Sequence, residues 1–303
     1  MASRNQETRS ASGNIQSDSS RSGASKSTLV NSIAQTFVIA YKEPTEQLVT
    51  VLSQFGCDCT VLRQVHQPGY ETYSPSFLCL MNHRSAWELA LRSQKPTLVV
   101  EADFVPVSGF AQLPPPFDPA DAELGIAWLY TCAAQIYNVS KKELSFPLAQ
   151  GYSTSMVAYV ITPKSARLLI ELAAQIEKAP GPRQYTPWDS GIEYYLREHG
   201  LRNYVPFRNY GEHGGLPNPE HGKNKLSRAH RADVLYNKLA FAPMYATADG
   251  RVNHRRWLKT RMYARIKGIG RLLLLKYLRM ATVKQSRQAS ELIWFAIVRH
   301  LKI

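Results

Sequence analysis

Short apolar runs alternate with helical patterns from residue 36 to residue 205, and this alternation leaves few folds open to the chain. Apolar strands are expected at 36–40, 59–65, 97–100, 124–131, 156–161 and 203–205. Helices are expected at 44–55, 76–91, 163–176 and 188–199. Strands that alternate with helices are typical of an α/β fold, so we predict a mostly parallel sheet flanked by helices.

Charge is distributed very unevenly along the chain. The 303 residues hold 37 Lys and Arg against 23 Asp and Glu, a formal net charge of +14. Residues 251–303 contain fourteen basic residues and one acid, Glu291, which leaves +13 on this segment. We therefore expect a nearly neutral globular domain at 35–250 and a cationic tail at 251–303, and the two need separate explanations.

Apolar residues recur at intervals of three and four in the tail, which predicts one apolar stripe on a helix at about 255–280. The stripe consists of Leu258, Met262, Ile266, Ile269, Leu273, Tyr277 and Met280. Gly268 and Gly270 are expected to weaken or bend this helix. A basic amphipathic helix is typical of a protein that lies on an anionic membrane surface. The alternatives are a stripe that packs on the body and, with no recognition motif in support, nucleic-acid binding.

The first 34 residues are Ser-rich and lack an apolar segment, so we expect a disordered tail in place of a secretory signal. A transit peptide is the alternative on composition, against which Glu7 and Asp18 argue.

Cys57 and Cys59 form one Cys-x-Cys pair without a matching second pair, which favours free thiols in a reducing cytosol over zinc. No apolar run is long enough to span a membrane. We expect a cytoplasmic protein, peripheral at the inner face of a membrane.

Two acids, Glu101 and Asp103, follow the apolar strand at 97–100. In an open α/β sheet, ligands bind beyond the carboxyl ends of the strands. Carboxylates one residue apart at such an edge can share a hard divalent cation, Mg²⁺ or Mn²⁺. A strand end that simply meets solvent is the alternative, and the spacing alone favours it.

Three further side chains are candidates for chemistry. Asp189 follows Trp188 at a predicted helix start, where an acid either complements the helix dipole or serves as a general base. The segment 210–225 is too rich in Gly, Pro and Asn for a helix or strand. Within it, His213 and His221 each follow a Glu, and imidazole is a ligand for divalent metals.

Three familiar motifs are absent from the sequence. No Gly-x-Gly-x-x-Gly follows a strand, and there is no Gly-x-x-x-x-Gly-Lys-Ser/Thr or Gly-x-Ser-x-Gly. These absences argue against a Rossmann dehydrogenase, a P-loop nucleotidase and an α/β-hydrolase.

Five blocks, taken in order, resemble glycosyltransferase family 25, which includes bacterial lipopolysaccharide glycosyltransferases. They are Phe37–Tyr41 at the first strand, Cys79–His83 on a helix, Thr97–Asp103 at the acidic strand, Ser155–Ala166 and Pro187–Asp189. The similarity covers roughly residues 36–205. Two features depart from the family pattern. Only Lys42 stands where an Arg-rich turn is usual, and Ala102 replaces the middle Asp of the family's Glu-Asp-Asp triplet.

The resemblance implies a GT-A-like fold and a metal-dependent hexosyltransferase. Such an enzyme moves a sugar from a nucleotide-sugar donor, a UDP-sugar, to a glycan or lipid-linked acceptor of lipopolysaccharide or surface polysaccharide. It implies Glu101 and Asp103 as ligands of Mn²⁺ or Mg²⁺, and from the later segment we choose His213 over His221 as the third ligand. It further implies His83 and Trp188 at the donor and Asp189 as the catalytic base, with a place in the core as the alternative for His83. Because of Ala102, a catalytically inactive protein that binds a sugar nucleotide remains the alternative.

Overall fold

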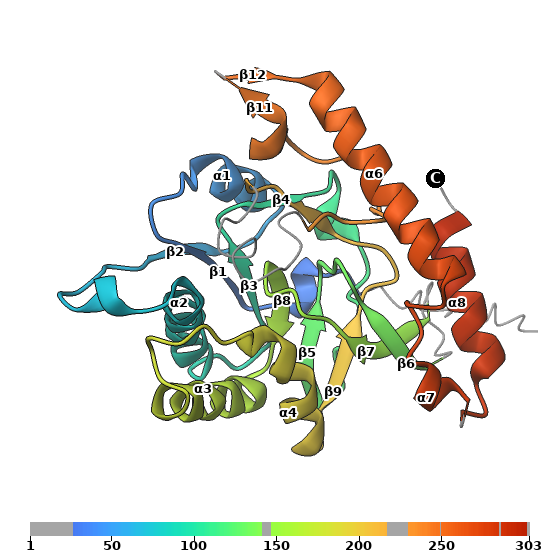
Figure 1. The fold of residues 1–303 in the computed structure, drawn as a ribbon, viewed down its shortest axis with the longest axis horizontal. Helices are drawn as coiled ribbons and strands as arrows, with labels where there is room; N and C mark the ends of the chain where they lie inside the picture. Colours follow the sequence, from blue (N-terminus) through green and yellow to red (C-terminus); the bar gives the residue numbers. More distant parts are fainter. Residues whose placement is uncertain (1–26, 141–146, 217–229, 249, 285, 302–303) are drawn as a thin grey trace, which may run out of the picture.

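A computed structural model describes residues 27–140, 147–216, 230–248, 250–284 and 286–301. Its centre is an eight-stranded sheet with the order β2-β1-β3-β8-β5-β9-β7-β6 (Figure 1). The strands are β1 (Gln35–Ala40), β2 (Cys59–Arg63), β3 (Thr97–Glu101), β5 (Leu124–Trp128), β6 (Gln135–Ser140), β7 (Leu148–Tyr152), β8 (Ala158–Ile161) and β9 (Arg202–Val205). The small two-stranded sheets pair β4 (Phe104–Pro106) with β10 (Gly211–His213) and β11 (Thr247–Ala248) with β12 (Arg251–Val252).

Most strands of the large sheet run in one direction. Strands β2, β1 and β3 are mutually parallel, and β5 is parallel to β9. Only β8 and β7 run the opposite way, each inserted antiparallel between strands of the main direction. The predicted α/β class with a mostly parallel sheet is therefore confirmed.

Helices cover the sheet. They are α1 (Glu46–Gln54), α2 (Pro75–Ala90), α3 (Pro163–Lys178), α4 (Ile192–Glu198), α6 (His254–Leu273), α7 (Met280–Val283) and α8 (Ala289–Leu301). Helices α2 and α3 lie together beside β1, β3 and β8, whereas α6, α7 and α8 flank the sheet on the side of β6 and β7 (Figure 1).

The core lies on both faces of the sheet, which explains why the strands read as continuous apolar runs. In β1, Phe37 and Ile39 join the cluster that contains Trp87 of α2, whereas Val38 joins the cluster that contains Leu52 of α1. Successive strand residues point to opposite faces, so a strand between two helical layers needs apolar side chains at every position.

The element boundaries differ from the sequence prediction in specific places. Helix α2 is capped by Ser74, whose hydroxyl accepts a hydrogen bond from the Phe77 N–H. Ser76, at the predicted start of this helix, donates to the Thr186 carbonyl. The hairpin of β6 and β7 was not predicted. The segment 210–225 was expected to be irregular, yet Gly211–His213 forms strand β10. Packing begins before Gln35, because Leu29 is fully buried.

The helix predicted at about 255–280 also differs from its prediction. Helix α6 runs without interruption through Gly268 and Gly270 and ends at Leu273. The chain then turns at Leu275, which has φ of 55°, and Tyr277 leaves the predicted stripe to enter the core. A Cβ at Gly268 would approach Cβ of Asp233 to 2.5 Å, so this glycine lets α6 pack closely on the body. No helix among the described residues combines the length and apolar content that crossing a bilayer requires.

An ionic cluster joins the start of β5 to β9. Arg202 on β9 pairs with Asp121, which precedes β5, and the Tyr204 hydroxyl donates to the same carboxylate at 2.6 Å. Burial alone would raise the pKa of Asp121, but the hydrogen bonds from Arg202 and Tyr204 outweigh it and hold the pKa at about 2. The lowered pKa means that Asp121 stabilises the fold above about pH 4 and loses this effect as the pH falls toward 2.

Asp121→Asn is therefore expected to lower the free energy of unfolding by about 2 kcal/mol at neutral pH, with the difference shrinking as the pH falls through this window. Urea unfolding across a pH series measures it. The exposed Asp58→Asn is the matched control and should change little. If Asp121→Asn lowered the free energy of unfolding as much at low pH as at neutral pH, the lowered pKa of Asp121 would be contradicted.

Candidate metal centre

The candidate site begins where β3 ends. Glu101 is the last residue of β3, and the chain turns through Ala102 and Asp103 into β4. The Ala102 N–H donates to the Ile39 carbonyl of β1 at 2.9 Å, and the Glu101 N–H donates to the Val157 carbonyl at 2.8 Å. The neighbouring strands therefore fix the backbone of this turn at the carboxyl edge of β1 and β3, where an open α/β sheet binds ligands.

Strand β10 brings His213 to the same turn. It pairs antiparallel with β4, so that His213 lies opposite Phe104, and the Gly214 N–H donates to the Asp103 carbonyl at 2.8 Å. Nε2 of His213 lies 2.9 Å from Oδ2 of Asp103. One possible ligand atom from each of Glu101, Asp103 and His213 lies within 4.8 Å of the other two. The structure thus places together the three residues that were predicted as metal ligands.

Glycine is required next to His213 because the backbone passes very close to Asp103. A Cβ on Gly215 would collide with Oδ2 of Asp103 and would lie 3.3 Å from Nε2 of His213. A Cβ on Gly214 would approach Cγ2 of Val105 to 2.6 Å. The Gly-Gly pair therefore leaves the two side chains room to face each other.

Arg231 holds the strand that carries His213, and sequence reasoning missed it. One Nη atom of Arg231 donates to the His213 carbonyl and the other to the Gly215 carbonyl, both at 2.8 Å. Its guanidinium lies 4.2 Å from the centre of the Tyr245 ring. No motif surrounds Arg231, so only the fold shows that it faces the site.

Asp103 and His213 shift each other's protonation. Burial opposes the charged form of both groups, yet their mutual attraction outweighs it. The pKa of Asp103 is lowered by His213 and then by Arg231, and the pKa of His213 is raised by Asp103 and then by Glu101. The two side chains therefore favour the ion pair over their neutral forms when no cation is bound.

The donor set fits a divalent cation. Within the described part of the chain, Oδ1 of Asp103 is buried and has no hydrogen-bond partner. A buried carboxylate oxygen without a partner is costly, and a bound cation would satisfy it. Two carboxylates suit Mg²⁺ or Mn²⁺, and the imidazole favours Mn²⁺ because Mg²⁺ prefers oxygen ligands.

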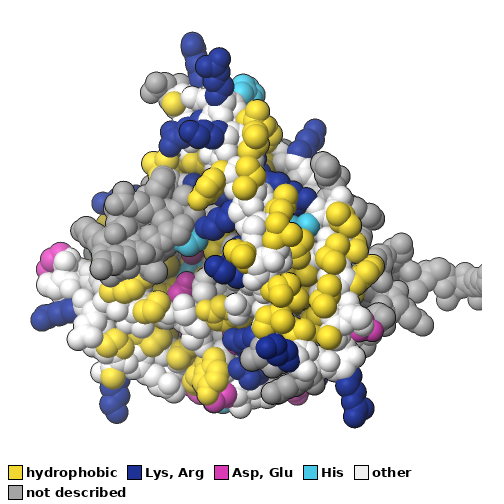
Figure 2. Space-filling model, turned by 45° about the vertical axis from the view of Figure 1, so that its right-hand side comes forward, with side chains coloured by type: hydrophobic (Ala, Val, Ile, Leu, Met, Phe, Trp, Pro, Cys, Tyr) yellow, Lys and Arg dark blue, Asp and Glu magenta, His cyan; other side chains and the backbone are white. Residues whose placement is uncertain are grey.

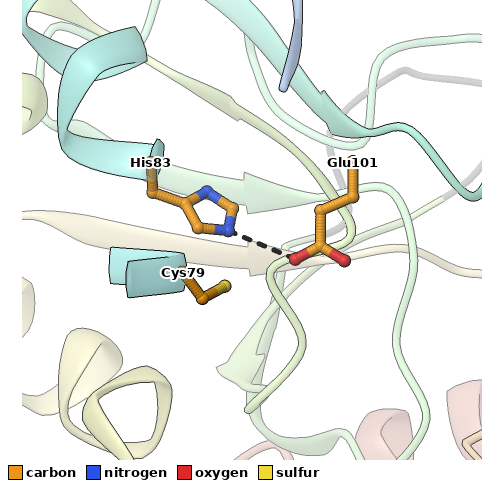
Figure 3. A group of neighbouring side chains, drawn as sticks. All are labelled: Cys79, His83 and Glu101. Carbon is orange, nitrogen blue, oxygen red and sulfur yellow. Dashed lines mark hydrogen bonds and ion pairs between the residues drawn. The ribbon is translucent and has the colours of Figure 1, made fainter. Parts of the chain in front are cut away.

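His83 orients Glu101 from helix α2 (Figure 3). Its Nε2 lies 3.2 Å from Oε1 of Glu101, and its Nδ1 lies 2.8 Å from the Tyr159 hydroxyl. A carboxylate accepts, so Nε2 of His83 donates to Glu101, and Nδ1 shares a second hydrogen bond with the Tyr159 hydroxyl. His83 is fully buried. These contacts give it a positioning role, while the donor contact that the resemblance implied stays a prediction.

Cys79 lies one turn before His83 on α2 and points to the same space (Figure 3). Its sulfur, a ring nitrogen of His83 and a carboxylate oxygen of Glu101 lie within 4.8 Å of one another. Because this group shares Glu101, it is part of the same site.

Trp188 and Asp189 lie on the 3-10 helix η4 (Trp188–Gly191). The Trp188 ring is buried 5.2 Å from the His83 ring, and its Nε1 donates to the Ser76 carbonyl. Trp188 therefore packs behind His83, and stacking on a sugar stays a prediction. Asp189 is partly exposed and accepts a hydrogen bond from the Ser190 N–H at 2.9 Å.

Basic residues of α6 and Asp189 both influence the Cys132 thiol. Burial raises the pKa of the Cys132 thiol to about 11, with Lys267 and Arg271 opposing the rise and Asp189 adding to it. Arg271 also donates to the Ala134 carbonyl at 3.2 Å. Asp189 and two cations from α6 therefore all influence the pKa of the same thiol. His221 lies outside the described residues.

No protein-family model and no curated protein sequence matches the chain. One similar solved structure is a glycosyltransferase involved in the glycosylation of the major capsid of PBCV-1, with 14% identity and a TM-score of 0.36 over 57% of this chain and 81% of that chain. Another is a mutant of the Drosophila β-1,4-galactosyltransferase 7 in complex with manganese, UDP-Gal and xylobiose. It has 11% identity and a TM-score of 0.31 over 57% of this chain and 65% of that chain.

A third is the inositol-1-phosphate CTP transferase from T. maritima, with 10% identity and a TM-score of 0.29 over 57% of this chain and 66% of that chain. These similarities are too distant to carry a conclusion about the chemistry of this chain. The resemblance to glycosyltransferase family 25 therefore stays a prediction.

The ion pair with Asp103 predicts a measurable change in the pKa of the His213 imidazole. In the metal-free protein, the His213 imidazolium should persist above pH 6.5, because Asp103 raises its pKa. In Asp103→Asn the attraction of Asp103 is lost while burial still opposes the charged form, so the His213 pKa should be lower than in the unsubstituted protein. NMR titration of the histidine ring protons measures both. A His213 titration that is the same in the two proteins would contradict the pairing.

Proposed function

We propose that this protein is a metal-dependent hexosyltransferase that moves a sugar from a UDP-sugar to a glycan or lipid-linked acceptor. The observation that supports it most is the convergence of Glu101, Asp103 and His213 at the carboxyl edge of the sheet, with Oδ1 of Asp103 buried and unpartnered among the described residues. Such a site suits Mn²⁺, with Mg²⁺ as the alternative, and a nucleotide diphosphate.

The five blocks that resemble glycosyltransferase family 25 meet around Glu101. Ile39 accepts from Ala102 beside it, His83 contacts its carboxylate, Tyr159 contacts His83, and the Trp188 ring packs on His83. Segments that are separate in the sequence thus build one neighbourhood. This arrangement supports a GT-A-like enzyme of lipopolysaccharide or surface polysaccharide synthesis, which would work at the cytoplasmic face of a membrane.

Each side chain then has a role in the transfer. Glu101, Asp103 and His213 would hold the cation, which when bound offsets the negative charge of the departing diphosphate. Asp189 accepts the proton of the acceptor hydroxyl as that oxygen attacks the anomeric carbon, which inverts the configuration at this carbon. His83 keeps Glu101 oriented.

A protein that binds a sugar nucleotide without turnover is the second candidate, and Ala102 is the observation that favours it. The Ala102 side chain offers no ligand atom where the family pattern has an Asp. His213 offers one, so the site keeps three donors without that Asp. Turnover separates the two candidates, because both predict metal and nucleotide binding.

Metal binding and turnover should depend on Asp103. Mn²⁺ titration followed by electron paramagnetic resonance, together with release of UDP from a panel of UDP-sugars, measures both. Asp103→Asn should weaken Mn²⁺ binding and lower turnover by at least about 100-fold, because it removes a charged ligand. Binding in the unsubstituted protein should weaken as the pH falls through the raised pKa of His213, since a ligand imidazole must be deprotonated.

Asp58→Asn serves as the control on an exposed acid and should leave both readouts unchanged. Tight Mn²⁺ binding without UDP release from any donor would support the inactive protein and reject the enzyme. Equal Mn²⁺ binding by Asp103→Asn would reject the metal centre itself.

The base role of Asp189 makes a separate prediction. Asp189→Asn should lower the rate of sugar transfer by about 10²–10⁴-fold, because the acceptor hydroxyl loses its proton acceptor. Affinity for Mn²⁺ and UDP should stay the same, because Asp189 is not among the metal ligands. A parallel loss of UDP affinity would assign Asp189 to donor binding.

A further inference from the structure

Helix α6 turns its arginines inward. Arg261 pairs with the fully buried Glu212 and donates to the Ala232 carbonyl at 2.8 Å, and Arg265 donates to the His300 carbonyl. Ala264, which lies between these two arginines, and Gly268, which follows Arg265, are buried as well. The face of α6 that meets the body therefore carries polar and small side chains. An ordinary amphipathic surface helix turns its large apolar side chains toward the body.

The apolar stripe of α6 points away from the body. Leu258 is 54% exposed, Ile266 is 64% exposed and Leu273 is 77% exposed, and Met262 and Ile269 between them are also exposed. The 20-residue helix is about 30 Å long, and the stripe from Leu258 to Leu273 takes up about 22 Å of it. The sequence left open whether the stripe packs on the body, and among the described residues it does not.

Helix α8 extends the same surface. It contacts α6 and exposes four large apolar side chains: Ile293, Trp294, Ile297 and Leu301. Figure 2 shows the hydrophobic side chains as a band over this side of the molecule, with Lys and Arg side chains at its upper end and along its lower edge. We call this surface, made of Leu258, Met262, Ile266, Ile269 and Leu273 with the four α8 residues, the outer face.

We propose that the outer face binds the surface of an anionic lipid bilayer. A continuous exposed apolar surface of this length marks a contact site. Exposed cations accompany it along α6 and beyond, namely Arg251, Arg255, Arg256, Lys259, Lys267, Lys276, Lys284 and Arg287. Apolar side chains flanked by Lys and Arg match a layer whose acyl chains lie beneath anionic headgroups.

Aromatic side chains support the same occupant. Trp294 of α8 is 53% exposed and Tyr263 of α6 is also exposed. Trp and Tyr are enriched where a protein meets the membrane–water boundary, because an apolar ring and a polar group can face the two sides.

Two other occupants fit less well. A second copy of this chain would bring two cationic surfaces together, and like charges oppose such a contact. Residues 1–26 offer only two large apolar side chains, Met1 and Ile15, which is too few to cover the outer face.

The outer face also places the candidate site beside the membrane. Arg261 on the inner side of α6 pairs with Glu212, the residue before His213. The helix that would lie on the bilayer therefore contacts the strand that carries a candidate metal ligand. If the proposed sugar transfer holds, an acceptor held in the membrane is within reach of the site; this last step alone rests on the proposed function.

Cosedimentation with vesicles tests the inference. The full chain should bind vesicles of phosphatidylcholine mixed with phosphatidylglycerol, bind phosphatidylcholine alone at least about tenfold more weakly, and lose affinity as salt rises. A triple substitution of Leu258, Ile266 and Leu273 by Ser should weaken binding by at least about tenfold. The matched control replaces three exposed apolar residues elsewhere, Val65, Tyr194 and Leu216, by Ser and should bind as the unsubstituted chain does.

Mn²⁺ binding by the triple variant should be unchanged, which shows that it folds and separates this test from that of the metal centre. Equal vesicle binding by the triple variant would overturn the inference. So would a concentration-dependent dimer in sedimentation velocity that the same triple substitution abolishes, because the face would then belong to a second copy. Vesicle binding that appears only after removal of residues 1–26 would assign the face to that segment.

Discussion

The pairing of β4 with β10 is the contact on which the candidate site depends. It spans two antiparallel segments about a hundred residues apart in the chain and sets His213 opposite Phe104, one residue from Asp103. The Gly214 N–H closes the pairing on the Asp103 carbonyl, and the small Gly214 and Gly215 allow this approach. Without it, Glu101 and Asp103 would be two acids at the end of a strand, with no third ligand and with no imidazole beside Asp103.

Buried ion pairs connect this site to the C-terminal helices. Glu212, next to His213, is fully buried with Arg261 of α6, and Asp233 binds Arg299 of α8 at 2.5 and 2.8 Å. Breaking one member of a buried pair costs about 3–5 kcal/mol, because the other charge is left without a partner. These pairs therefore fix which side of α6 faces the body. They explain why a strongly basic segment presents its apolar side to the surroundings.

Local patterns predicted the elements, whereas long-range contacts decided the site. Continuous apolar runs located β1, β3 and β8, because strands covered on both faces need apolar side chains throughout. The turn at Glu101 and Asp103 followed from the end of such a run. The Glu-His pattern singled out His213 as a candidate ligand but not its place in the fold, and the ion pair with Asp103 and the role of Arg231 arise from strand pairing, which leaves no local signal. In the tail, periodicity identified the stripe on α6 but not its direction, because buried arginine pairs outweighed the usual rule that apolar faces turn inward.

The central claim is that Glu101, Asp103 and His213 hold one divalent cation, and a crystal structure grown with Mn²⁺ and UDP tests it most directly. Anomalous scattering should locate one Mn²⁺ in direct contact with Oδ1 of Asp103, with the Asp103–His213 contact opened and Nε2 of His213 turned to the ion. UDP should lie with its diphosphate against the same ion. An ion bound elsewhere, or UDP bound with the Asp103–His213 pair intact and no ion between Glu101 and Asp103, would contradict the account.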